Sequence, residues 1–418
     1  MSRPYHPLVP EPLPLGRNHD FRVLLTSQGV SALGDAVSFT ALPLLVLALT
    51  GSGLWMGVVG ALSTLPDLFF GMIAGALADR SDRKRMMFLA DLGRAILTAL
   101  IPISVVLGGP TLAVILLVTA PMSILRSFFL AGYTASVPIL VGRPQLARAN
   151  SIFEAVYSFG YIIGPAIAGL LAATIGAGLT LAIDAASFAI SSFVLALIRH
   201  DLRAPAERSE ASLIADIREG IVFIVHHPVL RPMILFWGLV SITLAPLVAA
   251  LTVHVTRDMA QNATILGLVL TAYGIGTVLG ALLTARTSRR TVAPFLLGGT
   301  LTTGILLTVV SRTDQIPVLL GAALIAGSAQ SVVLVTYLTA RTNLSPDQLL
   351  GRVGSTARTI SLGLQPIGML VGGALIDLTD GSTTLAAMGL VLVVLTLGFA
   401  PIGALRRATT LPSTTSAI

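Results

Sequence analysis

Apolar segments long enough to cross a lipid bilayer recur along the whole chain. A helix needs about 20 apolar residues to span the hydrocarbon layer, and by that measure the sequence predicts twelve spans. The expected spans cover residues 22–48, 54–78, 86–107, 111–133, 151–173, 178–198, 230–255, 262–285, 292–311, 316–338, 353–377 and 382–404. Because backbone polar groups inside a bilayer must bond internally, these spans are expected to be helices. The sequence therefore predicts an all-α membrane protein whose main partner is the lipid bilayer.

Composition excludes several other classes of protein. The 418 residues are 54% hydrophobic and 11% charged, whereas soluble domains carry about a quarter charged residues. The sequence has no cysteine, so neither a disulfide framework nor a thiolate metal site is expected. The net charge of +7 is spread over short connections and forms no continuous basic face, so we expect no nucleic-acid partner.

The sequence also lacks the motifs of an enzyme. Lys84 is the single lysine and no glycine-rich loop precedes it, which excludes a phosphate-binding loop and built-in ATP hydrolysis. No HExxH or GxSxG motif occurs. The histidine pair at 226–227 has no companion ligands that the sequence reveals. We predict a protein that is not an enzyme, holds no metal and no cofactor, and takes energy from an ion gradient such as that of protons.

The cationic residues predict how the chain crosses the membrane. The connections on one side hold nearly all of them, including the cluster at 80–85, whereas those on the other side hold only Arg257 and Arg312. An excess of arginine and lysine marks the cytoplasmic side. With an even number of spans, the tails at 1–21 and 406–418 are both expected in the cytoplasm. We expect a multi-pass protein of the bacterial cytoplasmic membrane, and a monomer.

The spans divide into two halves of six, at 22–198 and 230–405. The connection at 199–229 is the longest and most polar, and its apolar residues recur at helical spacing between charged ones. This pattern predicts an amphipathic helix on the cytoplasmic membrane surface. Its apolar positions include Leu213, Ile214, Ile217 and Ile221.

The two halves repeat each other in sequence. Residues 75–85 align with 280–290 at an offset of 205, and residues 164–169 align with 368–373 at an offset of 204. Two landmarks at nearly one offset indicate an internal repeat. Parallel repeats related by an axis along the membrane normal are one established plan for membrane transporters.

The first landmark carries a resemblance to a known family. The stretch Gly75-Ala-Leu-Ala-Asp-Arg-Ser-Asp-Arg-Lys-Arg85 resembles the signature loop between the second and third helices of major facilitator superfamily transporters. Asp82 stands where that family usually has a second glycine, and Asp91 and Arg94 follow in the next span, as in many relatives. The resemblance extends over nearly the whole chain in hydropathy and repeat. It implies the superfamily's fold, with twelve helices in two pseudo-symmetric six-helix halves.

The resemblance also implies a cytoplasmic latch, a charge network that holds one conformation and breaks in the other. Such a network is a bistable set of ion pairs, and static anchoring of the loops is the alternative. The aligned loop of the second half has Thr284 in place of Asp79, so a switching role would rest on the first half. Gly75 is expected to permit close helix approach. The candidates, placed at the cytoplasmic ends of spans two, three and five, are Gly75, Asp79, Arg80, Arg83, Asp91, Arg94 and Glu154.

Asp35 is the first candidate for proton coupling. It lies near the middle of the first span, on a polar stripe with Gln28, Ser31 and Ser38. A carboxylate at the bilayer centre costs about 2.5 kcal/mol or more, so it must be paired, protonated or in contact with water. The alternative is a structural acid that bonds to backbone or to a neighbouring helix.

Asp67 and Arg126 are the other coupling candidates. Asp67 follows Pro66 in the second span, where the proline frees a backbone carbonyl; a satisfied acid at a local kink is the alternative. Arg126 is the one cation deep in a span, and it resembles an arginine that many proton-coupled superfamily members carry. Its R-x-x-x-G motif is incomplete here, because the next glycine is Gly132. An arginine snorkelling to the interface is the alternative.

The fifth span contains a motif that resembles the G-x-x-x-G-P signature of exporters in this superfamily. Small residues permit tight helix packing and proline bends a helix, so ordinary packing is the alternative. Asp184 and Asp377 are expected nearer the outer surface, as caps or interface groups. The motif residues are Gly160, Gly164, Pro165 and Gly169, and the candidates for lining a central cavity are Gln28, Ser31, Gln330, Tyr337 and Gln365.

Together these features predict a secondary transporter that exports amphipathic drug-like molecules by alternating access, driven by protons. The spans are rich in Leu, Val, Ala and Phe, which suits an apolar cavity. The opening Asn18-His-Asp-Phe-Arg22 and the pair at 34–35 are similar to the drug- and siderophore-exporter branch. Two alternatives stay open. One is an importer or lipid carrier on the same fold, and the other is a membrane sensor or scaffold that transports nothing.

Overall fold

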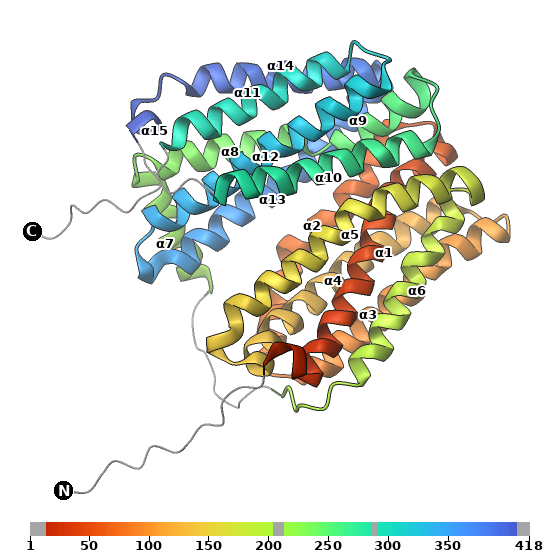
Figure 1. Ribbon diagram of the computed structural model, residues 1–418, viewed down its shortest axis with the longest axis vertical. Coiled ribbons are helices and arrows are strands. Elements are labelled where there is room, and N and C mark those ends of the chain that lie inside the picture. The colour runs from red at the N-terminus through yellow and green to blue at the C-terminus, as the bar shows by residue number, and fades with distance from the viewer. Residues whose placement is uncertain (1–13, 204–212, 286–290, 408–418) are drawn as a thin grey trace, which may run out of the picture.

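The computed structural model describes residues 14–203, 213–285 and 291–407. These residues form a bundle of helices without a β-strand (Figure 1). Twelve helical segments are long and apolar enough to cross a membrane, which confirms the predicted all-α fold. The outer parts of both predicted tails, the middle of the linker and residues 286–290 of the second repeat loop lie outside the described residues.

The first half consists of six membrane-length helices. They are α1 (His19–Thr50), α2 (Gly53–Ala78), α3 (Arg83–Val106), α4 (Thr111–Val141), α5 (Leu146–Ile175) and α6 (Ala177–Ala196). Within this half α1 packs on α5 and α6, α3 packs on α4 and α6, and α2 packs on α4. Figure 1 shows this half as the red to yellow-green part of the ribbon.

The second half begins with a span that is not one continuous helix. The predicted segment 230–255 is divided into α8 (Leu230–Leu244), α9 (Leu247–Val253) and a π-helical turn at His254–Asp258. The break falls at Pro246, which has no backbone N–H to continue the helix. The remaining elements are α10 (Ala263–Ala285), α11 (Val292–Val310), α12 (Ile316–Leu344), α13 (Leu350–Leu378), α14 (Gly381–Phe399) and the short α15 (Gly403–Arg407).

A helix forms in the linker between the halves, at α7 (Leu213–His226). It packs against α13, where Glu219 pairs with Arg352. Gly220 lies so close to the backbone of Arg352 that a Cβ would reach its carbonyl oxygen at 2.8 Å. The linker helix is thus attached to the second half.

Several helices begin where a polar side chain accepts the first backbone N–H groups. Asn18 accepts from Phe21 N at 3.0 Å, and Asp380 accepts from Thr383 N at 2.6 Å. Asp82 does the same for α3, by accepting from Arg85 N at 3.2 Å. Asp82 is the residue that departs from the superfamily pattern, and N-capping gives it a physical role.

The two halves meet closely at one end of the bundle, which we call the closed end. There α2 crosses α13 and α5 crosses α10. Glycines make the crossings possible, because a Cβ on Gly267 would lie only 3.1 Å from Gly169 Cα and one on Gly373 would meet the backbone of Gly53. Such small-residue contacts let membrane helices approach closely.

Hydrogen bonds across the halves reinforce the closed end. The Asp377 carboxylate accepts from Ser52 Oγ at 2.5 Å, from Gly53 N at 2.5 Å and from Leu54 N at 3.1 Å. A carboxylate of α13 therefore bonds to the first N–H groups of α2. Arg257 donates to Gly51 O at 2.9 Å beside it.

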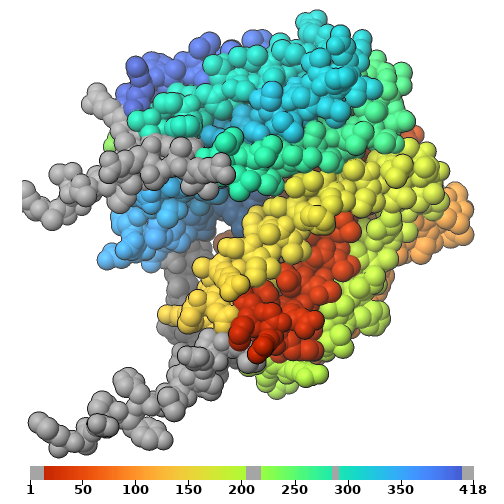
Figure 2. Space-filling model, in the orientation of Figure 1, coloured from red at the N-terminus to blue at the C-terminus, as the bar shows by residue number. Residues whose placement is uncertain are grey.

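The opposite end, which we call the charged end, holds the Asp79–Arg85 connection and the starts of α5 and α8. Figure 2 shows a hollow that separates the yellow helix α5 from the blue residues of the second half toward this end. The structure therefore places the two halves in contact at the closed end and apart toward the charged end.

Candidate functional site

A buried arginine in α3 forms the centre of the first half. Arg94 Nη2 bonds to Asp35 Oδ1 at 2.7 Å, and Arg94 Nη1 bonds to Asp91 Oδ1 at 3.2 Å. Its guanidinium also lies over the Phe188 ring, 3.7 Å from the centroid. The side chains of Arg94 and Asp91 are 4% and 0% exposed, whereas that of Asp35 is 33% exposed. Asp35 is thus the accessible member of a buried charge cluster.

Hydroxyl groups hold the buried acids of this cluster. Ser191 Oγ donates to Asp91 Oδ2 at 2.5 Å, and Ser191 in turn bonds to Ser27 Oγ at 2.7 Å. Asp184 on α6 is 1% exposed and accepts from Ser38 Oγ at 2.5 Å. Asp184 also lies against Gly34, the residue before Asp35 in α1. Two carboxyl groups, those of Asp35 and Asp91, therefore share one arginine, and the Asp184 carboxyl group is held against the same helix α1.

Asp184 was missed as part of this site. The sequence interpretation placed it nearer the outer surface as a cap or interface group, whereas the structure buries it between α1 and α6, seven residues past the start of α6 at Ala177. A usable signal was present: Asp184, Ser187 and Ser191 recur at i, i+3 and i+7, the same polar stripe that identified Asp35. Asp377, the second residue interpreted in this way, does act as an interface group at the closed end.

The structure divides the predicted latch into two groups. Asp91 and Arg94 lie 8 and 11 residues past the start of α3 at Arg83, which corresponds to about 12 and 16 Å along the helix. They were expected at the end of the span, and this placement is wrong. The physical reason is that α3 begins at the cluster itself, capped by Asp82, so that these residues fall inside the bundle.

The other latch candidates stay at the charged end. Arg83 lies 3.8 Å from Asp79, whose side chain is 70% exposed, and Arg83 Nε donates to Ala78 O at 3.0 Å. Arg80 and Glu154 are exposed. The close helix approach expected at Gly75 is not seen, because a Cβ there would meet no atom within 4 Å. In this conformation Arg83 is buried against the end of α2, and Asp79, Arg80 and Glu154 are exposed.

Asp67 and Arg126 form a second charge pair, between α2 and α4. Arg126 Nη2 bonds to Asp67 Oδ2. Ser127 Oγ and Ser123 Oγ donate to the other carboxylate oxygen at 2.5 and 3.2 Å. Half of the Arg126 side chain and about a fifth of that of Asp67 are exposed. Arg126 is therefore bound to an acid of the neighbouring helix α2.

The small residues of the α5 motif pack against two different helices, α1 and α10. A Cβ on Gly160 would lie 3.2 Å from the backbone of Ala32, and one on Gly164 would lie 2.5 Å from Ala36 Cβ, so both glycines fit α5 against α1. Gly169 instead faces α10 of the other half, and the carbonyl of Pro165 approaches Gly267 there. The motif therefore contributes both to packing within the first half and to the contact between the halves at the closed end.

The predicted cavity residues differ in how they are held. Ser31 is buried, and Gln28 and Gln365 are half-buried. Tyr337 stacks on Trp237, with ring centroids 4.9 Å apart. Gln28 Nε2 and Gln330 Oε1 are buried amide atoms without a hydrogen-bond partner in the described part of the structure. Such atoms can bind water or a ligand.

An aromatic group beside Asp35 was also not predicted. Tyr161 of α5 lies 4.6 Å from Tyr157 and 6.0 Å from Phe39, between ring centroids. The charge of Asp35 interacts with both tyrosines. Among the described residues, no three His, Asp or Glu side chains gather as a metal site would require. The arrangement offers an accessible acid next to an aromatic wall.

Comparisons with known proteins agree with this architecture. The profile of a family described as transmembrane secretion effectors matches residues 12–415. The multidrug efflux pump Tap of Mycolicibacterium fortuitum is 31% identical over 385 residues, which cover 89% of this chain and 93% of Tap. The macrolide efflux protein A of Streptococcus pyogenes is 28% identical over 202 residues, about half of each chain.

Solved structures show the same fold. The nucleoside transporter NupG matches with a TM-score of 0.73 and 14% identity, covering 91% of this chain and 98% of NupG. A bacterial homologue of the lysosomal transporter Spinster matches with a TM-score of 0.71 and 15% identity, covering 93% and 96%. The chain therefore belongs to the transmembrane secretion effector family of the major facilitator superfamily and is a multi-pass membrane transporter, not an enzyme.

Proposed function

We propose that this transporter exports amphipathic drug-like molecules from bacteria in exchange for protons. The observation that carries the proposal is the cluster in which Asp35 and Asp91 share Arg94 while Asp35 is the more exposed of the two acids. Unpaired charge within a membrane protein is costly. One arginine balances one ionised carboxylate, so the cluster as a whole favours the uptake of protons.

In the proposed cycle Asp35 is the residue that exchanges protons. When Asp35 is ionised, its 2.7 Å bond to Arg94 ties α1 to α3. Protonation of Asp35 removes the charge that attracts Arg94, which then relies on Asp91 alone. The loss of this tie frees α1 from α3 within the first half. The proton then shifts the equilibrium between the two conformations by the difference between its affinities for them. No ATP and no cofactor is needed, and a monomer suffices.

The proposed substrate class follows from the walls of the site. Phe39, Tyr157 and Tyr161 form an aromatic group on the half that holds Asp35. On the other half Trp237 is half-buried and stacks on the buried Tyr337. Pockets that are mostly apolar, with few polar groups, suit amphipathic molecules. The relatives named for multidrug and macrolide efflux support export rather than import.

The proposal is tested by proton release from everted membrane vesicles. Vesicles acidified inside by respiration and loaded with a pH-sensitive dye would receive lipophilic antibiotics and dyes. Substrates of a proton-coupled exporter should release protons from these vesicles, and vesicles without the protein should stay silent. Substrate uptake without proton release would disprove coupling. Uptake only by right-side-out vesicles would identify an importer or lipid carrier, and binding without uptake in either orientation would identify a sensor.

We propose further that the charged end faces the cytoplasm, together with both termini. The exposed Arg80, Arg143 and Arg148 lie at that end, and cytoplasmic connections are enriched in arginine. The closed end would then face outward, so that the structure represents a state open to the cytoplasm.

Cysteine labelling checks this orientation directly, because the natural chain has no cysteine. Ala147→Cys at the charged end and Gln315→Cys at the closed end both place the thiol at an exposed position. In intact cells an impermeant maleimide should label only Gln315→Cys. In everted vesicles it should label only Ala147→Cys. The reverse pattern would invert the proposed topology, and labelling of both in intact cells would reject the span assignment.

A further inference from the structure

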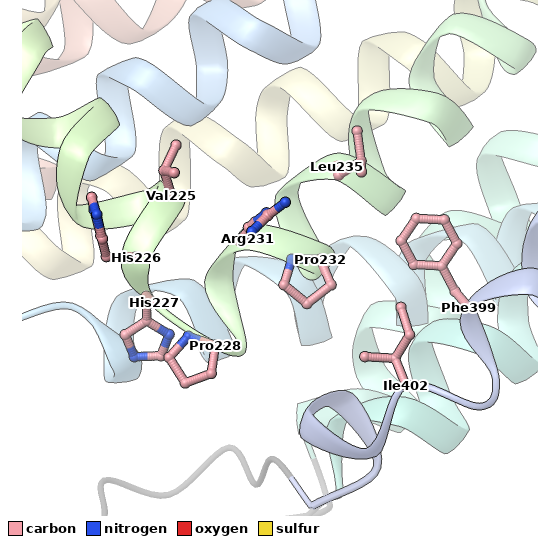
Figure 3. A pocket seen from close by; sticks show the side chains of 9 residues that line it. All are labelled: Val225, His226, His227, Pro228, Arg231, Pro232, Leu235, Phe399 and Ile402. Carbon is pink, nitrogen blue, oxygen red and sulfur yellow. The ribbon is translucent and has the colours of Figure 1, made fainter.

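A pocket of about 390 Å³ lies where the linker helix turns into the second half. It is bounded by the end of α7, the start of α8 and the chain that leaves α14 (Figure 3). The turn at His227 and Pro228 supplies one wall, and Phe399 and Ile402 supply another. The pocket is at the charged end and well separated in the chain from the Asp35 cluster.

One side of this pocket is rich in hydrogen-bond donors and positive charge. Arg231 and His226 are exposed and line it together with His227. His227 Nδ1 accepts from Leu230 N at 3.1 Å and from Val229 N at 3.2 Å, so its proton resides on Nε2. Burial lowers the pKa of His227, which favours this neutral, donating form. None of the nine lining residues is acidic.

The other side of the pocket is apolar and continues onto a membrane-facing surface. Val225 and Leu235 line the pocket with 48% and 52% of their surface exposed. Ile221 and Val222 extend the same apolar strip along α7, at 45% and 49% exposure. Such a strip on an amphipathic helix at a membrane surface is covered by acyl chains.

We propose that this pocket binds an anionic phospholipid from the leaflet at the charged end. Arg231 and His227 Nε2 would hold the phosphate, and the acyl chains would lie along Val225 and Leu235. His226 lies at the edge of the pocket and donates its Nδ1–H to Val222 O at 2.8 Å instead. A zwitterionic headgroup fits less well, because the lining residues offer no carboxylate for its ammonium group. The bound lipid would join α7 to α8 and so fix the linker helix on the second half.

The proposal can be tested with brominated lipids, which quench nearby tryptophan fluorescence. The chain has two tryptophans, so Trp55→Phe, Trp237→Phe and Phe399→Trp in the full-length protein give a single reporter that lines the pocket. The reporter protein would be placed in nanodiscs with increasing fractions of dibrominated phosphatidylglycerol or dibrominated phosphatidylcholine. We expect half-maximal quenching at a several-fold lower fraction of phosphatidylglycerol.

Substitutions of the pocket residues test whether the lipid binds in this pocket. Arg231→Gln in the reporter should weaken the phosphatidylglycerol preference about fivefold, since one arginine near an anionic surface contributes about 1 kcal/mol. Arg148→Gln removes an exposed arginine of the same end in the other half and should change nothing. His227→Asn provides a second test if Arg231→Gln fails to fold, because asparagine removes the Nε2–H group and keeps an oxygen that can accept from Leu230 N.

Three results would overturn the proposal. Equal quenching by both lipids would mean that the pocket does not select anionic headgroups. An unchanged preference in both Arg231→Gln and His227→Asn would place the lipid elsewhere. A change in reporter fluorescence on adding inorganic phosphate, together with equal quenching by the two lipids, would show that the cationic side binds free phosphate rather than a lipid.

Discussion

Asp35→Asn is expected to reduce proton-driven export on the order of 100-fold, the scale on which positioned proton-transferring side chains contribute. Asparagine keeps the size of the side chain, and its amide oxygen can still accept from Arg94. It cannot take up a proton. The protein should therefore still bind substrate and exchange it down a gradient, while proton release from everted vesicles is lost.

Asp201→Asn is the matched control for this experiment. Asp201 is an exposed acid that lies 3.9 Å from Arg203, and exposed pairs contribute about 0–1 kcal/mol. Its replacement should leave export unchanged. If Asp35→Asn exports at the wild-type rate, Asp35 is a structural acid. Proton coupling would then have to rest on Asp67, which binds Arg126 and two serines.

Most of the fold could be predicted from hydropathy and charge alone. The lipid environment permits few solutions for a chain with twelve apolar spans, and the repeat of 75–85 at 280–290 specified the two halves. Pro246 could have predicted the break in the seventh span, but the span was predicted as one continuous segment. Hydropathy therefore predicts the length of a membrane span more reliably than it predicts whether the span is one continuous helix. A proline can interrupt a span because neighbouring helices satisfy the carbonyl groups that it frees.

The candidate site was only partly predictable, for a geometric reason. Helical periodicity identifies which residues of one helix share a face, and this singled out Asp35. It does not specify which helix packs against that face. Arg94 was therefore assigned to the surface latch on motif grounds, whereas its partner Asp35 lies 59 residues away in the sequence. Asp184 was misplaced for the same reason, since its bond to Ser38 spans 146 residues.

The division of the latch changes what its residues are expected to do. Asp79 is exposed and lies 3.8 Å from the buried Arg83 in this conformation, so this loose pair can contribute mainly in the state in which the charged end closes. Arg94 and Asp91 are buried and hold the first half together in the structure described. The buried pair should therefore determine stability, whereas the outer pair should affect the balance between conformations.

Arg94→Met is accordingly expected to destabilise the protein by about 3–5 kcal/mol, the usual cost of leaving one partner of a buried ion pair uncompensated. Methionine fills a similar volume over Phe188 but leaves Asp91, which is 0% exposed, without its cation. Thermal unfolding in detergent micelles would measure the loss. Arg148→Met, at an exposed position, should change stability by no more than about 0.5 kcal/mol.

The double variant Asp91→Asn/Arg94→Met separates charge from packing. Asparagine can keep the bond to Ser191 without carrying a charge, so the double variant should regain much of the stability that Arg94→Met loses. A coupling energy of about 1–3 kcal/mol between the two sites is expected from a double-mutant cycle. Additive effects would mean that Arg94 stabilises the half through Asp35 and Phe188 and not through Asp91. The double variant should still fail to export, because Asp35 has lost the arginine whose attraction its protonation is proposed to switch.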